Sequence, residues 1–129
     1  DATSAWGFPR FQACMHHGPD GLVRLGPAAG RFLFHRTSAP LARLAEARLR
    51  PMRSVVPAEP VADPAWTTVP SSYVVCADDR AVRPEAQRER AALVGASVEL
   101  DSDHSPFLSR PAELARVIAE QHRDMVAAA

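Results

Sequence analysis

The sequence predicts an α/β fold in which short parallel strands alternate with helices, and three observations lead to this prediction. The length of 129 residues fits one domain. The composition, 47% hydrophobic and 23% charged, is ordinary for a globular protein and argues against disorder throughout. The C-terminal half carries segments in the order strand, helix, strand, helix, which is typical of an α/β unit with a parallel sheet.

The first 30 residues contain only short apolar runs and are expected to be irregular. Gly-Pro-Asp-Gly at 18–21 and Gly-Pro at 26–27 are turn signals. Residues 31–35, Arg-Phe-Leu-Phe-His, fit either one helical turn or a short strand, because periodicity cannot separate the two over so short a run.

A helix is expected after Ser38, which can cap a helix N-terminus, and Pro40 suits its first turn. Pro51 would end this helix. Its apolar face would consist of Leu41, Leu44, Ala45 and Leu49. Residues 51–70 are rich in proline and are predicted to be a semi-extended connector.

The second half begins with a continuous apolar run at 72–77, which predicts a strand covered on both faces. Pro84 would open a helix and Gly95 would end it. A second strand is predicted at 97–101, and the last helix would start near Ser109. In the first of these helices we expect Gln87, Arg88 and Glu89 to face outward and Ala91, Ala92, Leu93 and Val94 to face a core.

The charge pattern excludes several classes of partner. The formal net charge is zero and the arginines are scattered, so no basic stripe for nucleic acid is present. No apolar stretch approaches the ~20 residues that span a bilayer, so no membrane partner is expected. Cys14 and Cys76 form no metal motif, which favours a reduced, cytoplasmic protein without a metal or other cofactor.

A metal site built from residues 14–20 is a further interpretation of the sequence. The residues concerned are Cys14, His16, His17 and Asp20. Their spacing matches no zinc pattern, and the side chains of adjacent histidines diverge, so a surface turn is favoured.

Acidic residues and a histidine follow the two predicted strands. Asp78 and Asp79 come directly after the first strand, and His104 follows the second. Functional side chains of open α/β sheets gather at the carboxyl ends of strands, so these loops can be neighbours. A carboxylate beside an imidazole fixes its tautomer and stabilises the imidazolium, which general base catalysis needs. The competing interpretation is a solvated loop with a helix cap and a turn histidine.

Two segments resemble the C-terminal half of α/β-hydrolase-fold esterases, close to the plant methylesterase and hydroxynitrile lyase group and its bacterial relatives. Residues 73–88 are similar to their acid-bearing segment, in which Pro-Glu-x-Gln opens a helix, and residues 103–114 are similar to the segment holding their catalytic histidine. Residues 32–35 and the helix from Leu41 to Pro51 resemble part of their helical cap. The similarity covers about residues 21–126.

This resemblance implies a Ser-Asp-His mechanism with Asp79 as the acid, chosen over Asp78, and His104 as the general base. It also implies a cap-like segment with a connector over residues 1–65 and a strand-helix-strand-helix portion of the core over 66–129. The candidates for contact with an apolar substrate are Phe32, Phe34 and Phe107. A core role is the favoured alternative for the aromatic residues Trp6, Phe8, Phe11, Phe32 and Phe34.

The sequence departs from the family at the nucleophile. Members of the fold carry Gly-x-Ser-x-Gly before the acid, and no such motif surrounds Ser4, Ser38, Ser54, Ser71 or Ser72. His17-Gly18 is similar to an oxyanion dipeptide of the family, but it is better interpreted as a turn. We therefore expect the C-terminal half of a hydrolase, as a truncated product, a proteolytic piece or one chain of a split enzyme.

The preferred hypothesis is a carboxylic-ester hydrolase that acts on a small apolar ester once complemented. Its partner would be a complementary N-terminal chain or a second copy of this chain. The alternative is an inactive remnant that binds a small molecule or a partner through an exposed sheet edge. Hydroxynitrile lyase chemistry is disfavoured, because those enzymes use a lysine near the site and all fifteen basic residues here are arginine.

Overall fold

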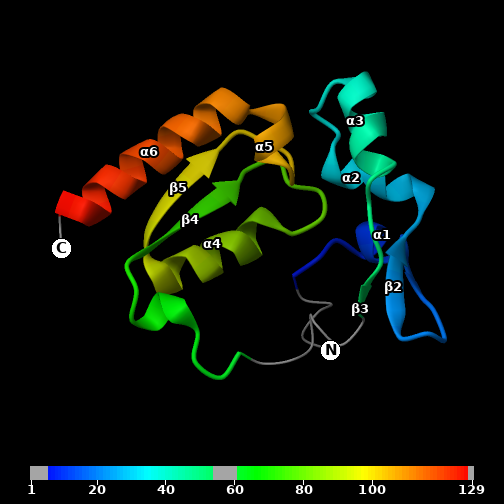
Figure 1. Ribbon diagram of the computed structural model, residues 1–129, viewed down its shortest axis with the longest axis horizontal. Helices are drawn as coiled ribbons and strands as arrows, with labels where there is room; N and C mark the ends of the chain where they lie inside the picture. The colour runs from blue at the N-terminus through cyan, green and yellow to red at the C-terminus, as the bar shows by residue number, and fades with distance from the viewer. Residues whose placement is uncertain (1–5, 54–60, 128–129) are drawn as a thin grey trace.

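Within the residues that the structure describes, the chain contains two small sheets, one antiparallel and one parallel (Figure 1). The structure is a computed structural model that describes residues 6–53 and 61–127. Among these residues no helix is both long and apolar enough to cross a membrane. The predicted α/β class is confirmed, since the second half holds parallel strands that alternate with helices.

The first half contains a hairpin that the sequence did not predict. Strands β1 (Met15–His17) and β2 (Leu22–Leu25) pair antiparallel around the predicted turn at 18–21. Gly21 takes a positive φ of 73° in that turn. Strand β3 (Met52–Arg53), inside the predicted connector, pairs with β2 as a third strand. The expectation of irregular backbone was wrong here, because strands this short are defined by their pairing partners rather than by their own residue pattern.

Short helices lie on both sides of the hairpin in the chain. Helix α1 (Pro9–Gln12) precedes it, and the 3₁₀ turn η2 (Pro27–Ala29) leads into α2 (Gly30–Leu33). The ambiguous run at 31–35 is therefore largely helical. Helix α3 (Ala39–Glu46) follows Ser38, which occupies the N-cap position without a side-chain cap hydrogen bond.

The predicted apolar face of α3 was right for Ala45 and wrong for its three leucines. Ala42 and Ala45 pack against the core, whereas the predicted residues Leu41, Leu44 and Leu49 are exposed, and Leu49 lies beyond the end of the helix. Helix α3 approaches α2 so closely that a Cβ at Gly30 would collide with the side chain of Glu46. Such a close approach suits small side chains, so the alanines face inward.

The core of the first half reaches into both loops that the sequence singled out. Its buried members are Cys14, Ala29, Leu33, Phe34 and Ala81. Ala81 belongs to the loop after Asp79, and Leu108, which packs against the same cluster, follows His104 by four positions. The first half and the loops after β4 and β5 therefore share one core.

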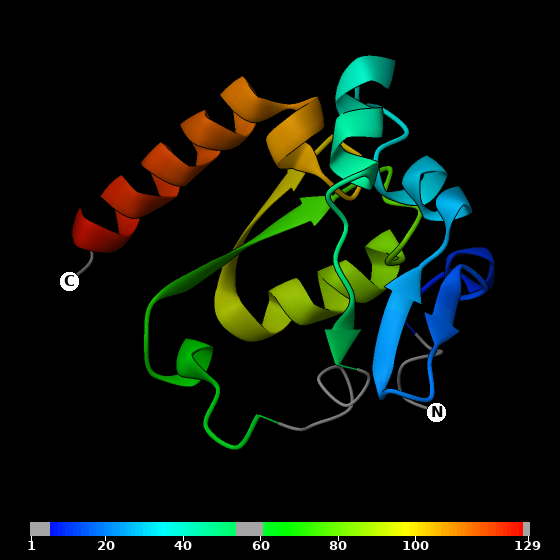
Figure 2. The same ribbon diagram turned by 45° about the vertical axis from the view of Figure 1, so that its right-hand side comes forward.

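The second half is the strand-helix-strand-helix unit that was predicted. Strands β4 (Ser71–Cys76) and β5 (Gly95–Leu100) pair parallel in register from Ser71↔Gly95 to Cys76↔Leu100. Helices α4 (Pro84–Val94) and α6 (Pro111–Ala127) lie on opposite faces of this sheet (Figures 1 and 2). A short helix, α5 (Pro106–Ser109), precedes α6, and the 3₁₀ turn η3 (Ala65–Thr67) precedes β4.

The orientation of α4 differs from the prediction. Gln87, expected to face outward, is only 4% exposed, and Leu93, expected to face inward, is 61% exposed. The buried side of α4 consists of Ala86, Gln87 and Ala91. Gln87 can be buried on that side because its amide forms hydrogen bonds with the Cys76 N–H at the end of β4 and with the Asp79 carboxylate.

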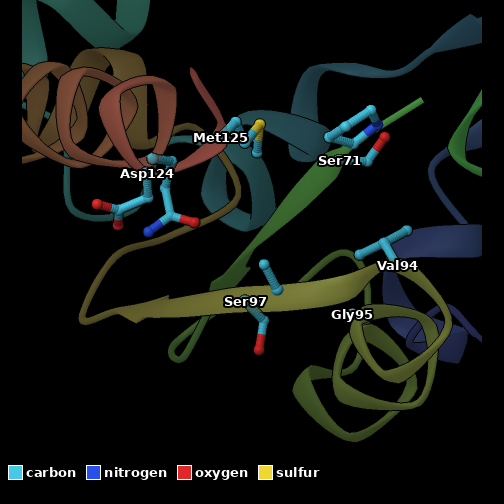
Figure 3. A pocket seen from close by; sticks show the side chains of 9 residues that line it. Ser71, Val94, Gly95, Ser97, Asp124 and Met125 are labelled. Atoms are coloured by element: carbon cyan, nitrogen blue, oxygen red, sulfur yellow. The ribbon is translucent and has the colours of Figure 1, made fainter. Parts of the chain in front are cut away.

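A groove of about 720 Å³ opens at the amino ends of β4 and β5, beside the C-terminal part of α6 (Figure 3). Ser71, Gly95 and Ser97 line it from the strands, and Gln121, Asp124 and Met125 line it from α6. Asp79 and His104 follow the carboxyl ends of the same strands, so the groove and the candidate residues belong to opposite ends of the sheet.

We predict that Gly95→Ala destabilises the chain, because Gly95 ends α4 with a φ of 84° that an L-residue with a Cβ adopts unfavourably. The expected loss is about 1 kcal/mol in the free energy of unfolding, measured by urea denaturation. Leu93→Ala, an exposed position two residues earlier, is the control and should change that free energy by no more than about 0.5 kcal/mol. Equal effects of the two substitutions would contradict the prediction.

Candidate active site

The side chains of Asp79 and His104 meet at the carboxyl edge of the parallel sheet. Asp79 lies three residues after the end of β4, and His104 lies four residues after the end of β5. His104 Nδ1 is 2.8 Å from Asp79 Oδ2. The parallel register aligns the ends of the two strands, which brings residues 25 positions apart into hydrogen-bond contact. Their catalytic roles remain a prediction.

The Asp79 carboxylate is buried and is surrounded by hydrogen-bond donors. Oδ1 accepts the backbone N–H groups of Ala81 at 2.7 Å and Val82 at 3.0 Å. Oδ2 accepts the Gln87 side-chain N–H at 2.8 Å and faces His104 Nδ1. Burying a carboxylate is costly unless its oxygens are satisfied, and these contacts satisfy both oxygens.

This arrangement fixes the tautomer of His104. An ionised carboxylate can only accept, so a neutral His104 must carry its proton on Nδ1 to bond to Asp79. Its Nε2 then holds the lone pair that a general base uses. The side chain of His104 is 39% exposed, whereas that of Asp79 is 2% exposed, so the base reaches the surface while the acid stays inside.

Gln87 also belongs to the site, although the sequence pattern predicted that it faces solvent. Its Nε2 donates to Asp79 Oδ2 and, at 3.1 Å, to the Val82 carbonyl, and its Oε1 accepts the Cys76 N–H at 2.9 Å. The amide therefore ties the end of β4 to the carboxylate that follows it. Its place in the first turn of a helix that begins five residues after Asp79 is the signal that could have revealed it.

Asp78 contacts the imidazole of His35, whereas Asp79 contacts that of His104. Its Oδ2 lies 3.1 Å from His35 Nε2 and 3.7 Å from a guanidinium nitrogen of Arg36. His35 and Arg36 lie two and three positions after the end of α2. Adjacent carboxylates thus divide their contacts between the two halves of the chain, and only Asp79 contacts His104.

Asp103 is a second buried carboxylate at this edge, and it directly precedes His104. Its Oδ1 accepts the Ser105 N–H at 3.1 Å and the Ser109 hydroxyl at 2.7 Å. Its Oδ2 accepts the Arg36 N–H at 2.9 Å. Nothing in the sequence marks it out, because a lone aspartate in a turn gives no spacing signal.

The aromatic candidates occupy different environments. Phe34 lies in the buried core, and Phe32 packs edge-on against Phe11 with ring centroids 6.0 Å apart. Both residues therefore pack in the first half, and their contact with substrate stays a prediction. Phe107, on α5 close to His104 in the chain, is 60% exposed, and its contact with substrate stays a prediction.

The residues considered for a metal site do not gather around one point. Cys14 is buried, and Asp20 forms an ion pair with Arg24 at 2.6 Å. Hydrogen bonds from Arg24 and from the Leu22 N–H lower the pKa of Asp20 to about 2. In the part of the chain that the structure describes, no group of three or more His, Cys, Asp or Glu side chains could hold a metal ion.

The serines closest to His104 in the described sequence are not accessible. Ser102 and Ser105 flank it in the chain, but both are buried. Burial raises the pKa of the Cys76 thiol, which keeps this nearby cysteine protonated and poorly nucleophilic. Ser4 and Ser54 lie outside the described residues.

Comparison with known proteins gives a family and a fold. A sequence model described as the alpha/beta hydrolase family matches residues 2–117. No curated protein matches the chain. Among solved structures, the crystal structure of polyneuridine aldehyde esterase superposes with a TM-score of 0.67 and 23% sequence identity, over 82% of this chain and 46% of that chain. A mutant of the same esterase gives a TM-score of 0.65 and 22% identity over the same shares. The chain thus spans less than half the length of these structures.

We predict that Gln87→Met destabilises the chain by about 1–3 kcal/mol, because it leaves the Cys76 N–H unpaired and removes a donor from Asp79. Urea denaturation measures the loss. Glu89→Met, a polar-to-apolar change at an exposed position of the same helix, is the matched control and should be nearly neutral. A Gln87→Met variant as stable as the control would show that the buried amide contributes nothing.

Proposed function

Because the chain belongs to the alpha/beta hydrolase family, we propose that it supplies the acid and the general base of a carboxylic-ester hydrolase. Asp79 is the acid and His104 is the base. The observation that carries the proposal is the 2.8 Å contact between Asp79 Oδ2 and His104 Nδ1, with the carboxylate buried and the imidazole partly exposed. The similarity to a structure named as an esterase supports the choice of reaction class.

In the proposed reaction His104 moves a proton twice. Its Nε2 takes the proton from a serine hydroxyl as the hydroxyl oxygen bonds to the ester carbonyl carbon, and the resulting imidazolium gives that proton to the departing alcohol. Water then attacks the acyl-serine, again losing a proton to Nε2, and the proton returns to the serine as the acid product leaves. Asp79 stays ionised throughout and stabilises the imidazolium through Nδ1–H.

The serine and the oxyanion donors are proposed to come from outside these 129 residues, which contain no Gly-x-Ser-x-Gly motif. A complementary N-terminal chain or segment is the proposed source. The fact that this chain spans 46% of the esterase structure supports this source. The proposed substrate is a small apolar ester, with Phe107 the exposed aromatic residue nearest in sequence to the base.

A second candidate function is binding without catalysis. Within the described ranges the parallel sheet has only two strands, so each strand has an outer edge without a strand partner. Apolar side chains such as Val69, Phe107 and Ile118 are exposed around the same unit. Unpaired edges favour association, and a chain that runs as a monomer in size-exclusion chromatography and binds no apolar ligand would argue against this alternative.

We predict that the chain, combined with an N-terminal part that carries the serine, hydrolyses p-nitrophenyl esters in a manner that depends on His104. His104→Ala should lower kcat by at least about 10³-fold, because the serine loses its general base. His122→Ala, at an exposed position on α6, is the matched control and should leave kcat unchanged. An active assembly whose rate is insensitive to His104→Ala would show that the assigned role is wrong.

A further inference from the structure

A buried carboxylate without a catalytic role lies next to the proposed base. Asp103 is 0% exposed, although it directly precedes the partly exposed His104. The proposed reaction uses Asp79 and His104 and leaves Asp103 unexplained. Because a buried carboxylate costs free energy unless its oxygens are well satisfied, its contacts need an account.

One oxygen of Asp103 closes a turn around His104. Oδ1 accepts the N–H of Ser105, two residues on, so His104 is the central residue of a turn that the Asp103 side chain completes. The same oxygen accepts the Ser109 hydroxyl from the end of α5. The backbone on both sides of His104 is therefore held by a single carboxylate oxygen.

The other oxygen ties this turn to the cap-like half. Oδ2 accepts the backbone N–H of Arg36 at 2.9 Å, across 67 positions of sequence. The Arg36 guanidinium, in turn, bonds to both carboxylate oxygens of Asp101 and lies 3.7 Å from Asp78. Arg36 thus contacts the loop of the acid and the loop of the base. In Figure 2, α2 and α3 lie at the end of the sheet to which the arrows of β4 and β5 point.

The donors to Asp103 are all uncharged groups. Two are backbone N–H groups and one is a hydroxyl, while the nearest arginine directs its guanidinium to Asp101. Neutral donors stabilise a buried charge less than a direct ion pair does. The gain from this arrangement is geometric, because three donors from three segments converge on one rigid side chain.

We propose that Asp103 is a positioning residue that holds the His104 imidazole against Asp79 and makes this orientation depend on Arg36 of the cap-like half. The inference rests on the proposed function, because only there is His104 the general base. Loss of the carboxylate would free the turn around His104 and weaken the Nδ1–H bond to Asp79. Loss of the Oδ2 acceptor alone would release the tether to Arg36 and leave the turn closed.

Two substitutions separate the contribution of the turn around His104 from that of the contact with Arg36. Asp103→Ala removes both, whereas Asp103→Asn keeps one oxygen for the Ser105 N–H and places an NH₂ group where Arg36 N–H needs an acceptor. Glu99→Gln is the matched control, since it makes the same charge change at an exposed carboxylate of β5. Gly95→Ala is a second control, because it is expected to lower stability at the far end of β5 without touching the site.

The measurement is proton NMR of the chain with ¹⁵N-labelled histidine, which reports the Nδ1–H proton of His104 and its exchange with water. In Asp103→Ala this proton should exchange at least about tenfold faster than in the unsubstituted chain, in line with the loss of charge-assisted hydrogen bonds. Asp103→Asn should give an intermediate rate. Glu99→Gln and Gly95→Ala should leave the exchange rate unchanged. If Asp103 acted only through the overall stability of the chain, the destabilised Gly95→Ala variant would exchange faster as well.

An unchanged exchange rate in folded Asp103→Ala and Asp103→Asn would overturn the proposal, and so would an equal acceleration in Gly95→Ala. If Asp103→Ala does not fold, the Asn variant alone decides. The outcome is independent of ester hydrolysis. If the assembly is inactive but the Asp103 variants still accelerate exchange of the His104 Nδ1–H proton, the proposed function is wrong and the positioning role of Asp103 is supported.

Discussion

The carboxylate of Asp79 is the group on which the rest of the site depends. It is buried, and it is satisfied by donors from its own loop, from α4 and from the loop after β5. A single buried polar group left without a partner costs about 1–3 kcal/mol, more when it is charged. The positions of Gln87 and His104 are therefore coupled, because both bond to Oδ2. A movement of α4 or of the loop after β5 would therefore weaken a hydrogen bond to the Asp79 carboxylate.

Residues of the first half form hydrogen bonds with both the loop after Asp79 and the loop before His104. Residues 6–8 run antiparallel to residues 81–83, with Phe8 N–H bonding to the Ala81 carbonyl and Arg83 N–H bonding to the Trp6 carbonyl. Trp6 also lies under the guanidinium of Arg90 on α4, 3.7 Å from the ring centroid. The hydrogen bonds hold the loop after Asp79, while Arg36 reaches the loop before His104. The boundary near residue 65 stays a prediction, and the loops after β4 and β5 pack against the core of the first half through Ala81 and Leu108.

Sequence reasoning found the elements whose patterns are local and missed those that depend on contacts made elsewhere. The apolar run of β4, the proline that opens α4 and the αL glycine that ends it all mark themselves in the sequence. The hairpin at 15–25 does not, because its strands are only three and four residues long. The orientation of α4 was predicted wrongly because Gln87 is polar and was therefore placed on the solvent side. Its amide instead forms hydrogen bonds with a carboxylate, a carbonyl and an N–H inside the fold. That environment exists only once β4 and the loop of Asp79 are in place.

The acid and base pair is assembled by contacts that all lie within this chain. Helices α4 and α6 cover the two faces of the β4–β5 sheet, which is the requirement that parallel strands impose. The donors to Asp79 lie between Ala81 and His104, and those to Asp103 come from Arg36, Ser105 and Ser109. What the unit lacks in the described residues is a lateral neighbour for its strands, not a partner for its buried charges. The contact between Asp79 and His104 is therefore complete within this chain, and in the proposed enzyme a serine-bearing segment would meet an imidazole that is already hydrogen-bonded through Nδ1.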